Sequence, residues 1–287
     1  MLSRRRLLAL ALPTGVAVAC GQPSGTALER ARAAGAIRIG ISGERPYSYA
    51  DADGRVTGAQ PEVARAVLGR IGVSGLDAVQ VPFHELIPRL RDGQFDLVAA
   101  GMTVTPDRCR EVAFTRPDFV AFPAFLVREG NPQEIESFRD VARSGARLAV
   151  LGGATEIDYA RAEGVRDEQL EIVDSQSELF RRVADERVPA GVLTRISLVD
   201  ELRRNPGSGL EVTEAVEPVV GDRRVVPGAA FAVRMGENDL LAAFDRELTA
   251  LQVSSEWLRI TEPFGFTREN LPPPDLTTEA LCRPGPA

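Results

Sequence analysis

The chain has 287 residues, enough for two domains of about 100–150 residues each. Hydrophobic residues make up 44% and charged residues 26%, which argues against a disordered, a collagen-like or a polytopic membrane protein. The 34 basic residues are all arginines and the formal charge is −7, so the chain offers no footprint for nucleic acid and no P-loop or Schiff-base lysine. One histidine and three cysteines exclude most His/Cys metal sites, and we expect neither a metal nor a cofactor.

Residues 1–19 are predicted to be a signal peptide. Arg4–Arg6 precede an apolar stretch that Pro13 interrupts and that is too short for a permanent membrane helix. The small residues before Cys20 resemble a lipobox, so we expect lipid on Cys20, with residues 20–27 as a tether to the outer face of a membrane. The alternative is an ordinary signal peptide in which Cys20 has no role. General and twin-arginine export remain equally open.

Two further cysteines, Cys109 and Cys282, remain once Cys20 is lipidated. In an exported protein such a pair predicts a disulfide, and the alternative is two free buried thiols. A bridge that closes so long a loop would stabilise the fold by roughly 5 kcal/mol in the chain-entropy model.

The first part of the chain alternates strand and helix signals. Strands are predicted at residues 36–42, 77–82 and 95–100, and helices at residues 62–71 and 84–92. This order is typical of an α/β sheet covered by helices.

A second α/β series follows Gly130-Asn131-Pro132. Strands are predicted at residues 147–151, 170–173 and 190–193, and helices at residues 138–143, 157–162, 177–185 and 197–204. Crossings between the two units are expected near residues 119–125 and 222–230. Further helices are expected at residues 239–251 and 254–260, followed by a proline-rich tail from residue 271 that we expect to be irregular and held by Cys282.

Residues 95–108, FDLVAAGMTVTPDR, resemble the hallmark stretch of family-3 extracellular solute-binding proteins, which serve ABC importers. Other segments similar to this family follow in the expected order, and the similarity covers nearly all of residues 27–282. The segments are Gly43–Tyr47, Gly58–Ala64, Gly153–Glu156, Asp107–Cys109, Gly228–Phe231, Glu262–Phe266 and Leu281-Cys282. Several of them look most like the ectoine/hydroxyectoine-binding branch.

The resemblance implies an α/β, two-lobed periplasmic-binding-protein fold of type II, with a ligand cleft between the lobes and two hinge crossings. Lobe 1 would contain residues 28–120 and 228–287, and lobe 2 residues 121–227. It implies an exported, lipid-anchored monomer that captures a small zwitterionic solute, above all ectoine or hydroxyectoine. Its partners would be the permease and ATPase complex of an ABC transporter.

Within this resemblance, Arg108 is expected to grip the ligand carboxylate, because guanidinium forms a bidentate fork. Thr155 would hold the same carboxylate from lobe 2, and Glu44 would accept hydrogen bonds from a ring amidinium. Tyr47 and Phe83 would be aromatic walls for its delocalised charge. Without the resemblance, the alternatives are a surface arginine, an N-cap threonine, a solvated glutamate and a core phenylalanine.

Three more ligand residues are expected: Gly101, Thr103 and Thr194. Thr103 stands where the ectoine-binding branch has a third aromatic wall. Thr194 stands where amino-acid-binding members carry an aspartate for the ligand ammonium, so the missing carboxylate favours a ligand whose charge Glu44 meets.

A polar amino-acid receptor of the same family is the main alternative. Some cyclohexadienyl dehydratases share this fold, and Glu44, Glu156 or His84 would then be the candidate acids. The sequence offers no nucleophile–base pair, so we expect a binding protein rather than an enzyme. A receptor-coupled sensor with the same binding chemistry is a further alternative.

Overall fold

The computed structural model describes residues 25–221 and 223–284. Residues 1–19 and Cys20, which carry the predicted export signal and lipidation site, lie outside this range. No helix in the described range is both long and apolar enough to cross a membrane.

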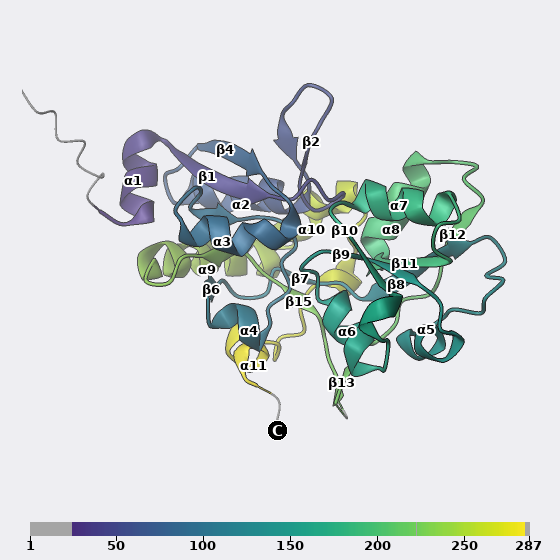
Figure 1. Cartoon of the computed structure of the whole chain (residues 1–287). Coiled ribbons are helices and arrows are strands. Elements are labelled where there is room, and N and C mark those ends of the chain that lie inside the picture. The colour runs from purple at the N-terminus through teal and green to yellow at the C-terminus, as the bar shows by residue number, and fades with distance from the viewer. Residues whose placement is uncertain (1–24, 222, 285–287) are drawn as a thin grey trace, which may run out of the picture.

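Lobe 1 is built on a sheet of five strands in the order β4-β1-β5-β16-β6 (Figure 1). The strands are β1 (Ala36–Ile41), β4 (Gly75–Gln80), β5 (Leu97–Val98), β6 (Ala113–Phe114) and β16 (Ala232–Val233). β1 is parallel to β4 and β5, and β16 is antiparallel to β5 and β6. The late strand β16 completes a sheet begun by the first part of the chain.

The helices of lobe 1 come from both ends of the chain. They are α1 (Ala27–Ala34), α2 (Ala59–Arg70), α3 (Leu86–Arg91), α4 (Pro106–Cys109), α9 (Asn238–Val253), α10 (Glu256–Thr261) and α11 (Thr278–Cys282). A short hairpin of β2 (Tyr49–Ala50) and β3 (Val56–Thr57) projects beside them. Helices α2, α9 and α10 pack on one another around buried Trp257, Phe244 and Leu68.

Helix α1 is not among the helices that the sequence predicts, and its first residue, Ala27, falls in the predicted tether. Thr26 caps α1 in a capping box with Glu29, an arrangement that satisfies free N–H groups at the helix start. The Thr26 hydroxyl also donates to Asp239, and the Ala27 N–H donates to Glu237 at 2.7 Å. The chain is therefore docked on lobe 1 from Thr26 onward.

Lobe 2 has a second sheet of five strands, in the order β10-β9-β11-β8-β12. The strands are β8 (Pro123–Arg128), β9 (Leu148–Leu151), β10 (Leu170–Val173), β11 (Ala190–Thr194) and β12 (Leu210–Val212). The helices are α5 (Phe138–Ser144), α6 (Glu156–Ala162), α7 (Gln176–Ala184) and α8 (Arg195–Arg204). A hairpin of β13 (Val219–Val220) and β14 (Arg223–Arg224) extends from it.

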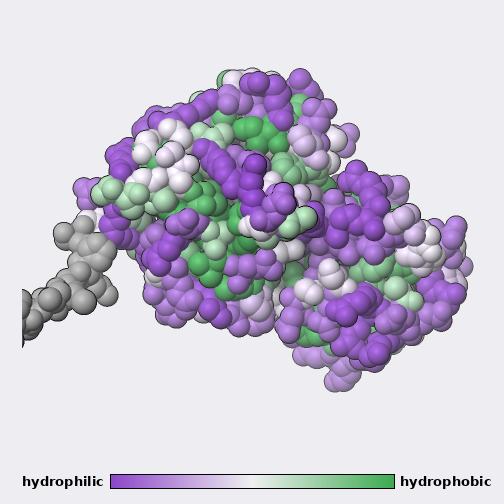
Figure 2. All heavy atoms as spheres, turned by 90° about the horizontal axis from the view of Figure 1, so that it is seen from above, coloured by the Kyte–Doolittle hydropathy of each residue, from purple (hydrophilic) through white to green (hydrophobic). Residues whose placement is uncertain are grey.

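The two lobes are joined by two neighbouring segments that pair with each other. β7 (Phe119–Val120) and β15 (Gly228–Ala229) form a two-stranded antiparallel sheet between the lobes (Figure 1). Both segments fall where the sequence predicts the crossings. Seen from above, the outline narrows between the lobes (Figure 2).

The C-terminal tail is not wholly irregular, as the sequence suggested, because residues 278–282 form helix α11. Thr277 caps this helix, which lies against α4. Cys109 of α4 and Cys282 of α11 form the predicted disulfide, with Cα atoms 5.7 Å apart. Both cysteines belong to lobe 1, so the bridge leaves the crossings free.

Candidate functional site: the cleft between the lobes

Residues of both lobes surround a cavity at the junction. Its lining is Glu44, Tyr47, Phe83, Gly101, Thr103, Arg108, Leu151, Ala154, Thr155, Glu156, Leu193 and Thr194. All eight residues predicted to bind a ligand are in this set. The cavity has a volume of about 30 Å³, room for one or two water molecules, because the two lobes are in contact.

Glu44 lies in the loop after β1 and is buried, with 6% of its surface exposed. Ser197 of lobe 2 donates a hydrogen bond to its Oε1 at 2.7 Å. Burial raises the pKa of Glu44 to about 8, and the nearby Glu156 carboxyl adds to this rise. The alternative of a solvated glutamate is therefore wrong.

Tyr47 packs against two buried aromatic side chains, Phe119 and Phe266. Its ring stacks on Phe119 with centroids 5.2 Å apart, and Phe266 meets both rings edge-on. Its hydroxyl shares a hydrogen bond of 2.6 Å with Thr194 of lobe 2. Burial holds the pKa of Tyr47 well above its usual value, so the phenol keeps its proton.

Arg108 crosses from lobe 1 to lobe 2. Its guanidinium donates to the carbonyl of Thr103 at 2.6 Å and to the carbonyl of Gly153 in lobe 2 at 2.8 Å. The Phe83 ring lies 5.4 Å from the guanidinium carbon, within reach of a cation–π contact. Burial lowers the pKa of Arg108, but a guanidinium remains charged. This is not the environment of a surface arginine.

A buried hydrogen-bond chain fixes the backbone at Gly101. Its N–H donates to Gln60 at 2.8 Å; Gln60 in turn donates to Asp118 at 3.2 Å, and the Trp257 indole donates to the same carboxyl at 2.7 Å. Gly101 has φ +68°, and a Cβ there would lie 3.0 Å from the Tyr47 ring. The turn therefore requires glycine.

The turn between β9 and α6 lines the cavity from the side of lobe 2. Thr155 is already helical, with φ −67° and ψ −19°, and its side chain makes no capping hydrogen bond. Thr155 thus stands at the N-cap position of α6, as the alternative predicts, but its hydroxyl does not cap the helix. A Cβ on Gly153 would lie 2.9 Å from the Cα of His84 in lobe 1, so the turn touches the opposite lobe.

Glu156, the first residue of α6, also lines the cavity and is 5% exposed. Burial raises its pKa, and its own N–H and the charge of Arg108 oppose that rise. The sequence reading weighed Glu156 only as an acid for the enzyme alternative. The signal for its position was its place directly after a glycine turn and Thr155.

Gln176 and Ser197 hold the loop of Glu44 from lobe 2. The Gln176 amide accepts from the Arg45 N–H at 3.1 Å and donates to the Arg45 carbonyl at 2.9 Å. It also donates to the Ser197 hydroxyl at 2.9 Å. The sequence did not reveal this contact, because polar residues at a helix start are usually caps.

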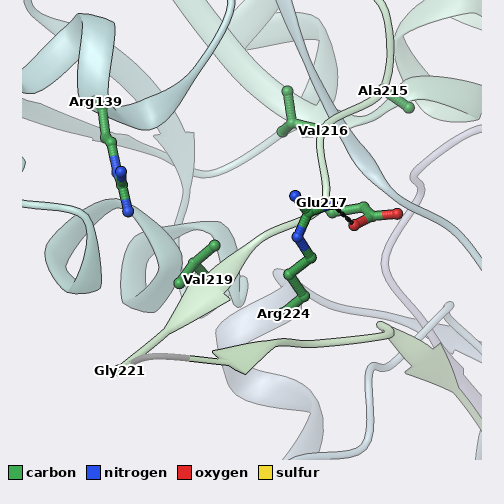
Figure 3. Close-up of a pocket in the computed structure, with 7 residues that line it drawn as sticks. All are labelled: Arg139, Ala215, Val216, Glu217, Val219, Gly221 and Arg224. Carbon is green, nitrogen blue, oxygen red and sulfur yellow. Dashed lines mark hydrogen bonds and ion pairs between the residues drawn. The ribbon is translucent and has the colours of Figure 1, made fainter.

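A larger, more open hollow of about 720 Å³ lies elsewhere on lobe 2, between α5 and the hairpin β13–β14 (Figure 3). Its lining is Arg139, Ala215, Val216, Glu217, Val219, Gly221 and Arg224. Arg224 pairs with Glu217, and Arg139 pairs with Glu163. None of the predicted ligand residues lies there, so the interlobe cleft is the candidate site.

The described part of the chain contains no group of three or more His, Cys, Asp or Glu side chains that could hold a metal ion. The chemistry of the cleft is therefore that of one guanidinium, two carboxyls, hydroxyls and aromatic faces.

Comparisons with known proteins agree with this geometry. Residues 37–267 match the family described as bacterial extracellular solute-binding proteins, family 3. A probable amino-acid ABC transporter periplasmic-binding protein of Sinorhizobium fredii is 31% identical, over 89% of this chain and 85% of that protein. The L-arginine-binding protein of Pseudomonas aeruginosa is 28% identical, over 79% of this chain and 87% of its own.

Two solved structures extend the comparison. The protein EhuB, in complex with hydroxyectoine, has a TM-score of 0.81 and 32% identity, covering 89% of this chain and 97% of its own. An ancestral arginine-binding protein bound to arginine has a TM-score of 0.70 and 27% identity, covering 80% of this chain and 98% of its own. With this fold, this cleft and these matches, the chain belongs to family 3 of the bacterial extracellular solute-binding proteins.

Proposed function

We propose that this protein is the solute-binding component of an amino-acid-type ABC transporter and that it captures a small zwitterion of the ectoine and hydroxyectoine type. The observation that carries the proposal is the pairing of Arg108 and Glu44 in one interlobe cavity. A guanidinium complements a carboxylate, and a buried carboxyl complements a delocalised cation. The similar EhuB structure holds hydroxyectoine.

In this proposal the ligand carboxylate accepts hydrogen bonds from the Arg108 guanidinium. In the structure these N–H groups donate to the carbonyls of Thr103 and Gly153. Thr155 adds a hydroxyl from lobe 2, and Gly101 and Thr103 supply the lobe 1 backbone around it. A cationic ring lies against Tyr47 and Phe83, where each aromatic face contributes about 0.5–2 kcal/mol once water is excluded. Glu44 releases its proton to solvent, and the resulting carboxylate pairs with the positive charge of the ring. Since both lobes contribute contacts, binding favours the closed arrangement.

A polar amino acid is the second candidate ligand, and Thr103 is the residue that favours it. A threonine there closes the cavity with a hydroxyl-bearing side chain rather than an aromatic wall, and the Pseudomonas relative is named for L-arginine. Against it, Thr194 offers a free ammonium only a hydroxyl that already bonds to Tyr47.

We further propose that Cys20 carries a lipid, that the protein acts as a monomer on the outer face of the membrane or in the periplasm, and that it delivers its ligand to a permease and ATPase complex. Catalysis is not proposed. A dehydratase-like reaction would need a general acid over the substrate, and in this scheme Glu44 serves binding.

Calorimetric titration of the chain beginning at Gly21 tests the ligand. The panel is ectoine, hydroxyectoine, glycine betaine, proline, glutamine, arginine and prephenate. We expect saturable binding of the ectoines and at least a 100-fold loss in Arg108→Ala, because the carboxylate loses a charge-assisted pair. Arg110→Ala is the matched control, since Arg110 is exposed in the same segment and pairs with Asp107. Preference for an α-amino acid would contradict the ectoine proposal, and unchanged affinity in Arg108→Ala would contradict the site.

A further inference from the structure

The carboxyl of Glu156 stands out among the buried acids of this protein. Glu44 accepts a hydrogen bond from Ser197, Asp118 accepts from Gln60 and Trp257, and Glu201 pairs with Arg204. Each of these acids has a side-chain partner beyond its immediate neighbour in the chain.

Glu156 differs because its hydrogen-bonding neighbours are its own N–H and the adjacent Thr155. Within residues 25–221 and 223–284 it makes no ion pair, although it is 5% exposed and lines the cavity. A carboxylate can accept about four hydrogen bonds, so these two local donors leave acceptor capacity unused, which calls for an explanation in a buried group.

An explanation follows from comparing the charged side chains of the cavity with the charges of a zwitterionic ligand. A zwitterion with one carboxylate and one cationic centre satisfies Arg108 and Glu44. Glu156 then still lines the cavity from lobe 2, and its oxygens have no donor beyond its own N–H and the adjacent Thr155. A site with such an acceptor discriminates strongly against an analogue that lacks the matching donor, because the acceptor stays unpaired.

We propose that Glu156 determines specificity by accepting a hydrogen bond from an additional O–H or N–H donor of the ligand. The cleft would therefore prefer a zwitterion with this extra donor over the matched compound without it. This inference rests on the proposed function, in that it assumes a carboxylate ligand held by Arg108 in the same cavity.

Matched pairs of ligands test the inference. The pairs are hydroxyectoine and ectoine, hydroxyproline and proline, and ornithine and norvaline, and the two compounds of each pair differ in one donor group. We expect the unaltered protein to bind the donor-bearing member of the recognised pair about tenfold more tightly. Glu156→Ala should reduce this ratio to less than twofold, whereas Glu156→Gln keeps an acceptor and most of the ratio. Asp158→Ala, an exposed acid on the same helix, is the control that should leave the ratio unchanged.

The two proposals fail in different ways. If the ectoine pair does not bind but another pair does, the ectoine proposal fails and the ratio in the binding pair still decides the role of Glu156. An equal ratio in the unaltered protein and Glu156→Ala would overturn that role, and so would no preference at all. If no pair binds, the carboxylate-ligand class that both proposals share is overturned. Melting without ligand is a separate check, because loss of an acid that is bonded only within its own turn should leave the melting temperature nearly unchanged, whereas loss of a partner of another element would lower it.

Discussion

At the scale of single residues, the cleft depends on acids held away from water. Glu44 shows the effect most clearly, because its carboxyl is 6% exposed and its hydrogen-bond partner is an uncharged serine. A serine hydroxyl compensates only part of the cost of removing a charge from water. The proton is therefore retained near neutral pH in the protein without ligand, and in the proposed function a cationic ligand would displace it.

This retained proton predicts a pH dependence of stability. The folded protein holds the Glu44 proton up to about pH 8, whereas an unfolded chain releases it near pH 4.5. Between these values unfolding releases a proton, so the free energy of unfolding falls as pH rises, by up to about 1.4 kcal/mol per unit. Urea unfolding without ligand at pH 5, 6, 7 and 8 measures the slope.

Glu44→Gln isolates this contribution, because it keeps the size of the side chain and removes the titration. Its slope should be flatter than that of the unaltered protein. Asp118, whose pKa burial raises to about 7, titrates in both proteins, so only the difference in slope is diagnostic. Equal slopes would contradict the assignment.

A second prediction for a single residue concerns the effect of Gly153→Ala on ligand affinity. Gly153→Ala would place a Cβ 2.9 Å from the Cα of His84 in the opposite lobe, at φ +77°. Closure would be obstructed, and we expect ligand affinity to fall at least tenfold by calorimetry. Gly130→Ala is a close control, because Gly130 has the same φ and open space around its Cβ. An equal loss in both variants would mean that backbone strain, not lobe contact, is responsible.

At the scale of elements, the start of α7 and the loop after β1 form an interlobe contact of their own. Gln176 bonds both the N–H and the carbonyl of Arg45, and Ser197 bonds the Arg45 carbonyl as well. These bonds form only when the lobes meet, and they touch the loop rather than the ligand. They should therefore stabilise closure equally for every ligand.

Gln176→Ala tests this expectation. We expect affinity to fall by roughly tenfold, through faster dissociation, for all ligands that bind, because buried groups of Arg45 lose their partner. Stopped-flow dissociation with two ligands of different size provides the measurement. Ser177→Ala changes the exposed neighbouring residue and should have no effect. A loss restricted to one ligand would show that Gln176 contacts that ligand.

The elements also show what could be predicted from the sequence. Apolar spacing located the long helices and the parallel strands of both sheets, and the motif order located eight of the twelve residues that line the cavity. The strands β6, β8, β12 and β16 were missed, because very short strands and strands buried on both faces carry little periodicity. The contacts of Gln176 and Ser197 with the loop of Glu44 were missed because they join lobes that are far apart in the sequence.

At the scale of the whole molecule, lobe 2 is inserted between two parts of lobe 1, and the bridge Cys109–Cys282 joins those parts. The bridge lies between α4 and α11, so it stabilises lobe 1 without linking the lobes. Reduction should lower the melting temperature by about 5–10 °C and leave ligand affinity within twofold. Scanning calorimetry and titration of the chain beginning at Gly21, with and without reductant, measure both. A bridge that matters for closure would instead change the affinity.

The same bridge decides how the molecule would respond to mechanical tension. A pull applied between Thr26 and the C-terminal end would run through α1 and the first part of lobe 1 and then pass directly from Cys109 to Cys282. The residues between the two cysteines, which include every strand of lobe 2, would carry no load. In the oxidised protein, lobe 2 is thus shielded from stretching along the chain, while the part of lobe 1 that precedes Cys109 bears the force.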